Sequence, residues 1–403
     1  MKFSVLIPTR DRLELLRYAV QSVLDQDYGD WELIVADNAS DSDVHAFVQS
    51  LADSRVTYIR TEEVVPVTEN WNLALKKASG DYIIMLGDDD CLMHSCLSIA
   101  ASIIEANGFP DVLYTEAIQF AYPGVMPGFE EGFVQYGYCK FLTGETEPFV
   151  LEKSVAKQCV KDAASFRIAY SYNMQHSFVS KTIVNRLREV GDFFQSPYPD
   201  YYATNALMWT ADRIVVCPWA LVAIGISPRS FGYYYFNRRE HEGEAFLKNV
   251  ADPDLARLAQ DILLPGSNMN TSWLLAMVAL KRNFGESEDI RIAYWRYRFM
   301  QFRYLWRTLP SNEFSGIVRE YARPLEAVLW RAIGLLDRTF GRLMPKRFWN
   351  YSVRLVLEAV HSSHPRYDSK RHLVPHKNIL ELARSHEEAF DAPSDWRRRV
   401  RAT

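Results

Sequence analysis

The chain has 403 residues, of which 48% are hydrophobic and 24% are charged, as in an ordinary globular protein. No stretch approaches the roughly 20 apolar residues that cross a bilayer, and the short apolar run that begins at Phe3 is too short for a signal peptide. The five cysteines are scattered without a CxxC pair, which predicts reduced thiols and argues against a disulfide framework or a zinc site.

The net charge of -4 conceals a difference between the two ends of the chain. Residues 281–403 contain 24 Lys and Arg against 14 Asp and Glu, whereas the first 280 residues contain 22 basic and 36 acidic side chains. This asymmetry predicts an acidic catalytic body, residues 1–236, that carries a basic C-terminal module, residues 237–403.

Strand and helix patterns alternate along the first 90 residues. In chain order we expect a strand at 3–7, a helix at 13–24, a strand at 31–36, a helix at 42–52, a strand at 56–59, a helix at 70–78 and a strand at 82–86. Polar residues follow the strands, as in an α/β fold with a mainly parallel, Rossmann-like sheet flanked by helices.

Three consecutive carboxylates, Asp88, Asp89 and Asp90, follow the apolar strand at 82–86. They fall at the edge where open α/β sheets bind ligands. Adjacent aspartates repel one another unless a cation lies among them, and Mg²⁺ is often shared between carboxylates and substrate phosphates. An acidic turn that caps the next helix is the alternative interpretation, since Asp is a favoured N-cap.

Neither of the common phosphate-binding glycine motifs is present: no GxGxxG follows the first strand, and no GxxxxGK[ST] occurs in the chain. Binding of a nucleotide would therefore not depend on a glycine-rich phosphate cradle. This favours a cation at Asp88, Asp89 and Asp90 as the means of holding phosphates.

Three blocks in this region resemble the family 2 glycosyltransferases, which are GT-A nucleotide-sugar enzymes. The blocks are residues 4–12 (SVLIPTRDR), residues 22–40 (SVLDQDYGDWELIVADNAS) and residues 72–90, which run from NLAL to GDDD. Each block is a weak signal alone, but the three in this order are specific. The resemblance covers about the first hundred residues.

The resemblance implies roles for individual residues. Pro8, Thr9 and Arg10 would line the nucleotide pocket, Asp37 and Asn38 would contact the base and ribose, and the block containing Asn72 would also contribute to nucleotide-sugar binding. The acids would form a DXD-type motif, with Asp88 and Asp89 at the nucleotide sugar and with Asp90 and Asp88 at a Mn²⁺ or Mg²⁺ ion. Many members have two aspartates where this chain has Asp37 and Asn38, which leaves the base open.

The middle of the chain contains two candidate contacts to the substrates. Residues 122–144 are rich in Gly, Pro and aromatic residues, and we expect a long loop there. His176 begins a strand pattern at 176–180 and is a candidate acceptor contact, with a structural histidine as the alternative. Arg229 is a candidate contact to the diphosphate, with an ordinary surface arginine as the alternative.

Asp200 lies just before a helical pattern at 203–211 and is a plausible N-cap. In inverting members of the family that the chain resembles, an acidic residue at this place is the general base. The resemblance therefore implies that Asp200 is catalytic, a role compatible with capping. Residues 214–217 and 221–224 follow and are expected to be two short edge strands.

Beyond residue 238 helical patterns dominate, and arginine alternates with aromatic residues in YWRYRF at 294–299. We expect helices at 255–264, 272–281, 290–309, 325–340, 348–361 and 377–386, and a basic tail at 397–399. Such helices bind anionic membranes or form dimer interfaces. A nucleic-acid partner is not expected, because no recognised binding motif accompanies the charge.

Together these features predict an inverting, metal-dependent glycosyltransferase that moves a sugar from a nucleoside-diphosphate sugar to a saccharide or lipid-linked saccharide. By the resemblance, it would act in bacterial surface polysaccharide synthesis, in the cytoplasm and at the inner face of the cell membrane. A non-catalytic sugar- or nucleotide-binding scaffold is the first alternative. A sugar-nucleotide pyrophosphorylase is the second, although it would need a Gly-rich loop with Arg and Lys after the first strand.

Overall fold

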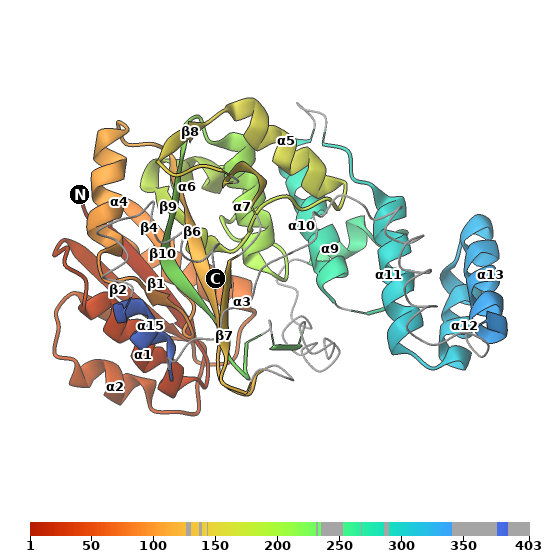
Figure 1. The fold of residues 1–403 in the computed structure, drawn as a ribbon, viewed down its shortest axis with the longest axis horizontal. Helices are drawn as coiled ribbons and strands as arrows, with labels where there is room; N and C mark the ends of the chain where they lie inside the picture. Colours follow the sequence, from red (N-terminus) through yellow and green to blue (C-terminus); the bar gives the residue numbers. More distant parts are fainter. Residues whose placement is uncertain are drawn as a thin grey trace.

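A ten-stranded sheet organises the described part of the chain, with helices on both of its faces (Figure 1). The computed structural model describes residues 1–125, 130–136, 139–142, 144–230, 233–234, 253–266, 268–285, 290–340 and 377–385. All five cysteines lie in described segments and are buried, and none of them forms a disulfide, as the sequence predicted.

The first four strands of this sheet are parallel, in the order β3-β2-β1-β4. They are β1 (Phe3–Thr9), β2 (Trp31–Asp37), β3 (Val56–Arg60) and β4 (Tyr82–Met85). Helices α1 (Leu13–Leu24), α2 (Val44–Ser50) and α3 (Val67–Lys77) connect them. Strands β1, β2 and β4 are mainly apolar on both sides because helices cover both faces, whereas the edge strand β3 is only partly buried.

The second half of the sheet is mixed. Strand β9 (Ser177–Ser180) runs antiparallel between β4 and β6 (Val112–Ala121), and β10 (Ile214–Ile226) runs parallel to β6. Because β9 opposes both of its neighbours, β6 and β10 point in the same direction as β4. The predicted α/β fold with a mainly parallel sheet flanked by helices is therefore confirmed.

Three short strands and ten further helices complete the described regular structure, apart from short 3₁₀ turns. The strands, all antiparallel to their partners, are β5 (Cys91–Leu92) and β8 (Phe149–Leu151) on β10, and β7 (Phe133–Tyr136) on β6. The helices are α4 (Cys96–Ala106), α5 (Lys153–Ala164), α6 (Lys181–Arg188), α7 (Pro199–Thr210), α9 (Pro253–Leu258), α10 (Met269–Phe284), α11 (Tyr294–Thr308), α12 (Ser311–Tyr321), α13 (Pro324–Phe340) and α15 (Ile379–Ser385).

Two expectations for the sheet were wrong. Residues 214–226 form the single strand β10 between β6 and β5, not two short edge strands. Pro218 cannot donate to a ladder, and the pairing shifts register between Cys217 and Ala220, so the interruption in the sequence is a bulge. The expected long loop at 122–144 contains β7, which pairs with β6.

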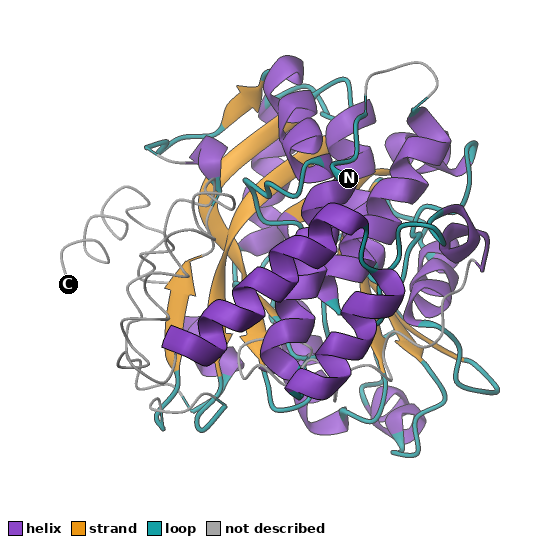
Figure 2. Cartoon of the chain, turned by 90° about the vertical axis from the view of Figure 1, so that its right-hand side faces the viewer, coloured by secondary structure: helices purple, strands orange, loops and turns teal. Residues whose placement is uncertain are grey.

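The C-terminal helices divide between two environments. Helix α10 packs against α7 and α5 and belongs to the same buried cluster as one face of the sheet. Helices α12 and α13 extend away from the sheet (Figure 1) and pack with Phe302 and Leu305 of α11 around a separate small cluster that includes Trp330, whereas Tyr297 of α11 belongs to the cluster of α10. Figure 2 views the molecule from this side, with helices in front of the sheet. Helix α15 returns to pack on α1, β5 and β10.

The predicted helices that lie in described segments are present, although α12 was not expected as a separate helix. The predicted helix at 348–361 and the basic tail at 397–399 lie outside the described residues, and so does the expected domain boundary at 236/237. Within the described segments, no helix combines the length and the apolarity needed to cross a bilayer.

Candidate active site

Asp88, Asp89 and Asp90, the acidic cluster, lie at the carboxyl end of β4 beside the end of β1. The backbone N–H of Leu86 donates to the carbonyl of Leu6, which continues the strand pairing up to the cluster. All three aspartates are buried. Buried carboxylates are unfavourable unless they are paired or hydrogen-bonded, so their partners define the site.

Asp88 and Asp89 share one cationic partner, Arg12. Nη1 of Arg12 lies 2.9 Å from Oδ1 of Asp88 and 3.7 Å from Oδ1 of Asp89. The hydroxyls of Thr9 and Ser227 donate to the other oxygens, at 2.8 Å to Asp88 and 2.9 Å to Asp89. Burial alone would lower the pKa of Arg12, but the two aspartates raise it, so the guanidinium stays charged.

Asp90 is held by three uncharged donors. The backbone N–H groups of Gly225 and Gly87 and the side-chain amide of Gln175 each donate to its carboxyl group at 2.8 Å. Burial, reinforced by the charge of Asp89, raises the pKa of Asp90 to about 7. A side chain at position 225 would collide with the backbone oxygen of Asp89, so glycine is required for this close approach.

The cluster has the ligand chemistry of a hard divalent cation, because Mg²⁺ and Mn²⁺ prefer carboxylate oxygens. Among the described residues, however, no three His, Cys, Asp or Glu side chains converge as a complete ligand set. Asp88 and Asp89 fit such an ion, with substrate phosphates supplying further ligands. That Asp90 binds the ion directly stays a prediction. If Asp90 did so, its oxygens would have to share or lose the three hydrogen bonds that they now accept.

The two residues expected at the base and ribose, Asp37 and Asn38, form hydrogen bonds within the fold, to their own loop, to β3 and to the segment after β3. Asp37 has no exposed surface, and its carboxylate accepts from the N–H of Ser40, the hydroxyl of Tyr58 and the guanidinium of Arg60. The amide of Asn38 is paired with the backbone at Val65. These side chains shape the end of β2 through their hydrogen bonds.

Pro8 and Arg10 lie on either side of Thr9, the last residue of β1. Pro8 pairs with Ala36 in the register of the parallel strands, whereas Arg10 is exposed. Their contact with a nucleotide stays a prediction. Thr9 differs from both, since it is buried and bonded to Asp88.

Asn72, expected at the nucleotide sugar, lies on α3 and ties this helix to the segment before α7. Its side chain accepts from the N–H of Phe194 at 3.2 Å and donates to the carbonyl of Phe194 at 2.9 Å. The hydroxyl of Thr68, one turn earlier, donates to the carbonyl of Ser196 at 2.6 Å. Helix α3 therefore fixes the segment from which α7 begins.

Asp200 is in the first turn of α7 and does not cap it, contrary to the expected N-cap. Pro199 begins the helix and Tyr198 is the cap residue, because proline fits the first helical position, where no N–H partner is needed. The carboxylate of Asp200 is partly buried and accepts from the N–H of Tyr201 at 3.1 Å. Burial raises its pKa to about 7, so it can exchange a proton near neutral pH.

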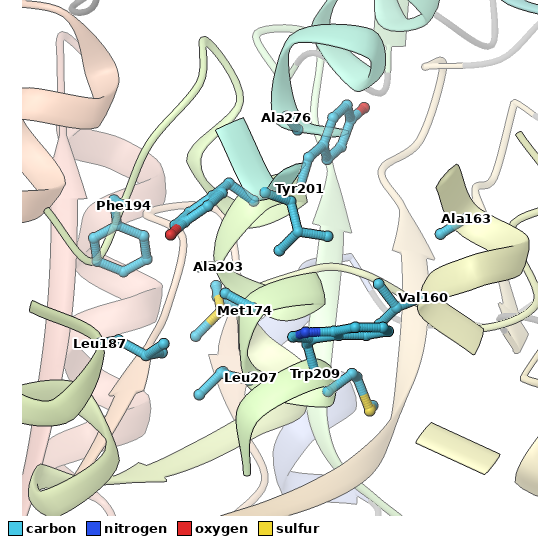
Figure 3. Packing of buried hydrophobic residues seen from close by; sticks show 14 of the residues in the cluster. Val160, Ala163, Met174, Leu187, Phe194, Tyr201, Ala203, Leu207, Trp209 and Ala276 are labelled. Carbon is cyan, nitrogen blue, oxygen red and sulfur yellow. The ribbon is translucent and has the colours of Figure 1, made fainter. Parts of the chain in front are cut away.

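A short chain of contacts joins the helix of Asp200 to the acidic cluster. Thr204 lies one turn after Asp200 on the same face of α7, and its hydroxyl donates to the carbonyl of Tyr172 at 2.7 Å and approaches the sulfur of Met174 at 3.5 Å. The next residue, Gln175, bonds to Asp90. Figure 3 shows Met174 among the side chains of α7.

His176 and Arg229, the two candidate substrate contacts, differ in their surroundings. His176 is buried and stacked on Tyr114, and its Nδ1 lies 2.8 Å from the carbonyl of Thr115. Burial lowers its pKa to about 4, so its ring is neutral at pH 7. Arg229 instead lies at the edge of the cluster, where its guanidinium donates to the carbonyl of Asp11. Their contacts with substrate stay predictions.

Four residues that hold the cluster were not singled out from the sequence: Arg12, Gln175, Gly225 and Ser227. Arg12 lies in the polar loop after β1. Because it is part of the first block that resembles the family, its position there could have identified it. The other three come from η2 (Met174–His176) and from the end and exit of β10, up to 138 residues away from their partners. No local pattern predicts such contacts.

Comparison with known proteins gives a family match for the N-terminal part of the chain. Residues 4–121 match the model described as glycosyl transferase family 2. A Campylobacter jejuni GalNAc(5)-diNAcBac-PP-undecaprenol beta-1,3-glucosyltransferase is 38% identical over 100 residues, which are 24% of this chain and 32% of the relative. The chain therefore covers about a third of that protein's length.

Two further proteins are similar to the chain, one in sequence and one in structure. The Escherichia coli UDP-Glc:alpha-D-GlcNAc-diphosphoundecaprenol beta-1,3-glucosyltransferase WfgD is 31% identical over 26% of this chain and 41% of its own. The solved structure of S. aureus TarS 1-349 in complex with UDP-GlcNAc has a TM-score of 0.49 and 15% identity, over 84% of this chain and 92% of that one.

Proposed function

We propose, from the membership of residues 4–121 in glycosyl transferase family 2, that the protein transfers a sugar from a nucleoside-diphosphate sugar to a hydroxyl of a saccharide or lipid-linked saccharide. The anomeric carbon is inverted in a single displacement. Two relatives named as glucosyltransferases that act on undecaprenol-linked saccharides support this class of acceptor.

The observation that carries the proposal is that residues 172–175 connect the helix of Asp200 to the acidic cluster. Asp200 has a pKa near 7, and its carboxylate interacts with the backbone N–H groups of Tyr201 and of Asp200 itself. The acidic cluster lies beyond Gln175 and Met174, which α7 contacts through Thr204. A general base with a near-neutral pKa, joined to a charge-binding cluster by this chain of contacts, suits attack by a hydroxyl on a sugar diphosphate.

Each group has a separate task in this reaction. Asp200 accepts the proton of the acceptor hydroxyl as it attacks the anomeric carbon from the face opposite the leaving group. Arg12 and Arg229 supply positive charge at the edge of the cluster. When bound, a Mg²⁺ or Mn²⁺ ion held by Asp88 and Asp89 would stabilise negative charge on the leaving diphosphate.

A two-stage screen tests the function. Thermal unfolding is first followed with UDP, GDP and dTDP and their sugars, each with and without Mn²⁺, to find the nucleotide that stabilises the protein. Release of that nucleoside diphosphate from its sugar is then measured with a polyprenyl-diphosphate-linked saccharide as the acceptor. We expect stabilisation by one nucleotide and acceptor-dependent release. No release from any donor that binds would contradict a transferase and favour a binding scaffold.

The exposed surface of helix α13 supports the proposal that the protein contacts a membrane that carries such acceptors. Its exposed positions Leu325, Val328, Leu329 and Leu335 form one apolar face, while Trp330 on the opposite side is buried against α11 and α12. Arg323 and Arg331 beside this face are exposed. An apolar face flanked by arginine suits an anionic lipid surface, and α13 lies far from the sheet (Figure 1).

Sedimentation with phosphatidylglycerol vesicles tests the membrane contact. Replacing Leu325 and Val328 together by serine should reduce the bound fraction at least threefold. Serine at Leu258, an exposed leucine on α9, should leave it unchanged. Equal binding of the double variant and the wild type would reject this face as the contact.

A further inference from the structure

Arg12 already pairs with the two carboxylates that would hold an external cation. One nitrogen, Nη1, lies 2.9 Å from Asp88 and 3.7 Å from Asp89. The Arg12 side chain is only 14% exposed, and those of the two aspartates are 5% and 9% exposed. The pair of carboxylates is therefore already neutralised in part, away from water, by a residue of the chain itself.

A reciprocal contact between two loops holds this arginine in place. Nη2 of Arg12 donates to the carbonyl of Arg229 at 2.8 Å, and the guanidinium of Arg229 donates to the carbonyl of Asp11, the neighbour of Arg12. The same loop also contributes Ser227, whose hydroxyl donates to Asp89. We call the two contacts of Arg229 with Asp11 and Arg12 the arginine clasp.

A divalent ion and the arginine cannot use the same oxygens at once. Mg²⁺ binds carboxylate oxygens at about 2.0–2.1 Å and needs near-octahedral surroundings. An ion at that distance from Oδ1 of Asp88 would share this oxygen with Nη1 of Arg12 at 2.9 Å. Two cations held together among buried groups repel strongly, because the local dielectric constant is low.

We propose that Arg12 is an internal counter-ion that competes with the divalent cation for Asp88 and Asp89. The arginine clasp must open, and the guanidinium must leave Asp88, before the ion binds. The released arginine then remains at the edge of the cluster, beside the negative group that arrives with the ion. The identity of this group as a nucleoside diphosphate rests on the proposed function. The competition between Arg12 and the ion for the two carboxylates is independent of that function.

Binding of Mn²⁺ alone, measured by the loss of the free-ion signal in electron paramagnetic resonance, tests the competition. Arg12→Gln should lower the Kd for Mn²⁺ at least tenfold, equivalent to about 1.4 kcal/mol. Arg12→Lys, which keeps the charge, should change it much less. Arg17→Gln removes an exposed arginine of the same helix region, packed over Phe47 at 4.4 Å, and should leave the Kd unchanged.

A Kd for Arg12→Gln that is equal to or higher than that of the wild type would overturn the proposal. Because Arg12→Gln leaves buried carboxylates without their cation and could prevent folding, a second measurement uses the unmodified protein. A crystal structure with bound Mn²⁺ should show Nη1 of Arg12 more than about 4 Å from Oδ1 of Asp88, beyond ion-pair distance. A bound ion on Asp88 or Asp89 with the arginine pair intact would also overturn it. Neither experiment contains a sugar nucleotide, so failure here is distinct from failure of the transferase function.

Discussion

The acidic cluster and Asp200 are both carboxylate sites, but they differ in how many hydrogen-bond donors surround the carboxylates. In the cluster, Asp90 accepts three hydrogen bonds, and Asp88 accepts two, from Thr9 and Arg12. Asp200 is partly buried. Among the described residues, the donors found for its carboxylate are the backbone N–H groups of Tyr201 and of Asp200 itself. Burial raises the pKa of both Asp90 and Asp200 to about 7, and at Asp90 the charge of Asp89 adds to this effect.

The difference indicates what each site can do. A carboxylate surrounded by fixed donors is rigid and suits the positioning of charge, because preorganised groups need no rearrangement during reaction. A desolvated carboxylate with few donors is held above its usual pKa and is available to take a proton from an incoming hydroxyl. Three substitutions test this contrast through stability.

Asp90→Ala should have the largest effect. It removes the acceptor for two backbone N–H groups and for the amide of Gln175, and each buried donor left without a partner costs about 1–3 kcal/mol. We expect the free energy of unfolding, measured with urea, to fall by about 3 kcal/mol or more. Asp192→Ala, at an exposed aspartate before α7, should change it little. A loss below about 1 kcal/mol for Asp90→Ala would show that the cluster is not rigidly held.

Asn72→Ala should have an intermediate effect, because Asn72 connects α3 to the segment that precedes Asp200. The substitution removes the hydrogen bonds to the N–H and carbonyl of Phe194, and we expect the free energy of unfolding to fall by about 2 kcal/mol. Asn107→Ala removes a single side-chain bond, to Ile103 at the end of α4, and is the matched control. Equal losses for the two variants would mean that Asn72 does not support α7.

Asp200→Asn should change stability by an amount that depends on pH, with the smallest effect of the three substitutions near pH 4. The carboxyl of an unfolded chain titrates near 3.9, whereas that of Asp200 titrates near 7 in the folded state. Between these values the folded state binds more protons, so this group makes the wild type less stable as the pH rises from 4 to 7.

The asparagine variant should therefore unfold at a higher temperature than the wild type at pH 8, and this gain should shrink towards pH 4. The same comparison for Asp192→Asn should show no such trend. A gain that is absent at pH 8, or one that grows as the pH falls, would contradict the raised pKa of Asp200.

The elements that the sequence predicted best are those specified by local pattern. The run from Tyr82 to Met85 forms β4 between two buried faces, and the acids follow it at the carboxyl edge. Strands β1, β2 and β4 could be predicted because each is a mainly apolar segment followed by polar residues, and β3 because its β-branched and aromatic residues favour a strand. The bulge in β10 was misinterpreted because Pro218 interrupts the pattern without ending the strand.

The partners of the cluster could not be predicted in this way, because they meet only through the order of strands in the sheet. Gly225 contacts Asp90 across 135 positions, and Gln175 contacts it across 85. Gln175 lies before β9, the strand that inserts antiparallel between β4 and β6. The sequence pattern indicated a strand at β9 but not its neighbours, so the contact appeared only in the structure.

The most direct test of the account separates turnover from binding in Asp200→Asn. With the donor identified by the screen, kcat for sugar transfer and the calorimetric Kd for the nucleoside diphosphate are measured for Asp200→Asn, Asp192→Asn and the wild type. We predict that Asp200→Asn lowers kcat by about 10²–10⁴-fold, the usual contribution of a general base. Its nucleotide Kd should stay within about twofold of that of the wild type, and Asp192→Asn should match the wild type in both quantities. Normal turnover by Asp200→Asn would contradict the account.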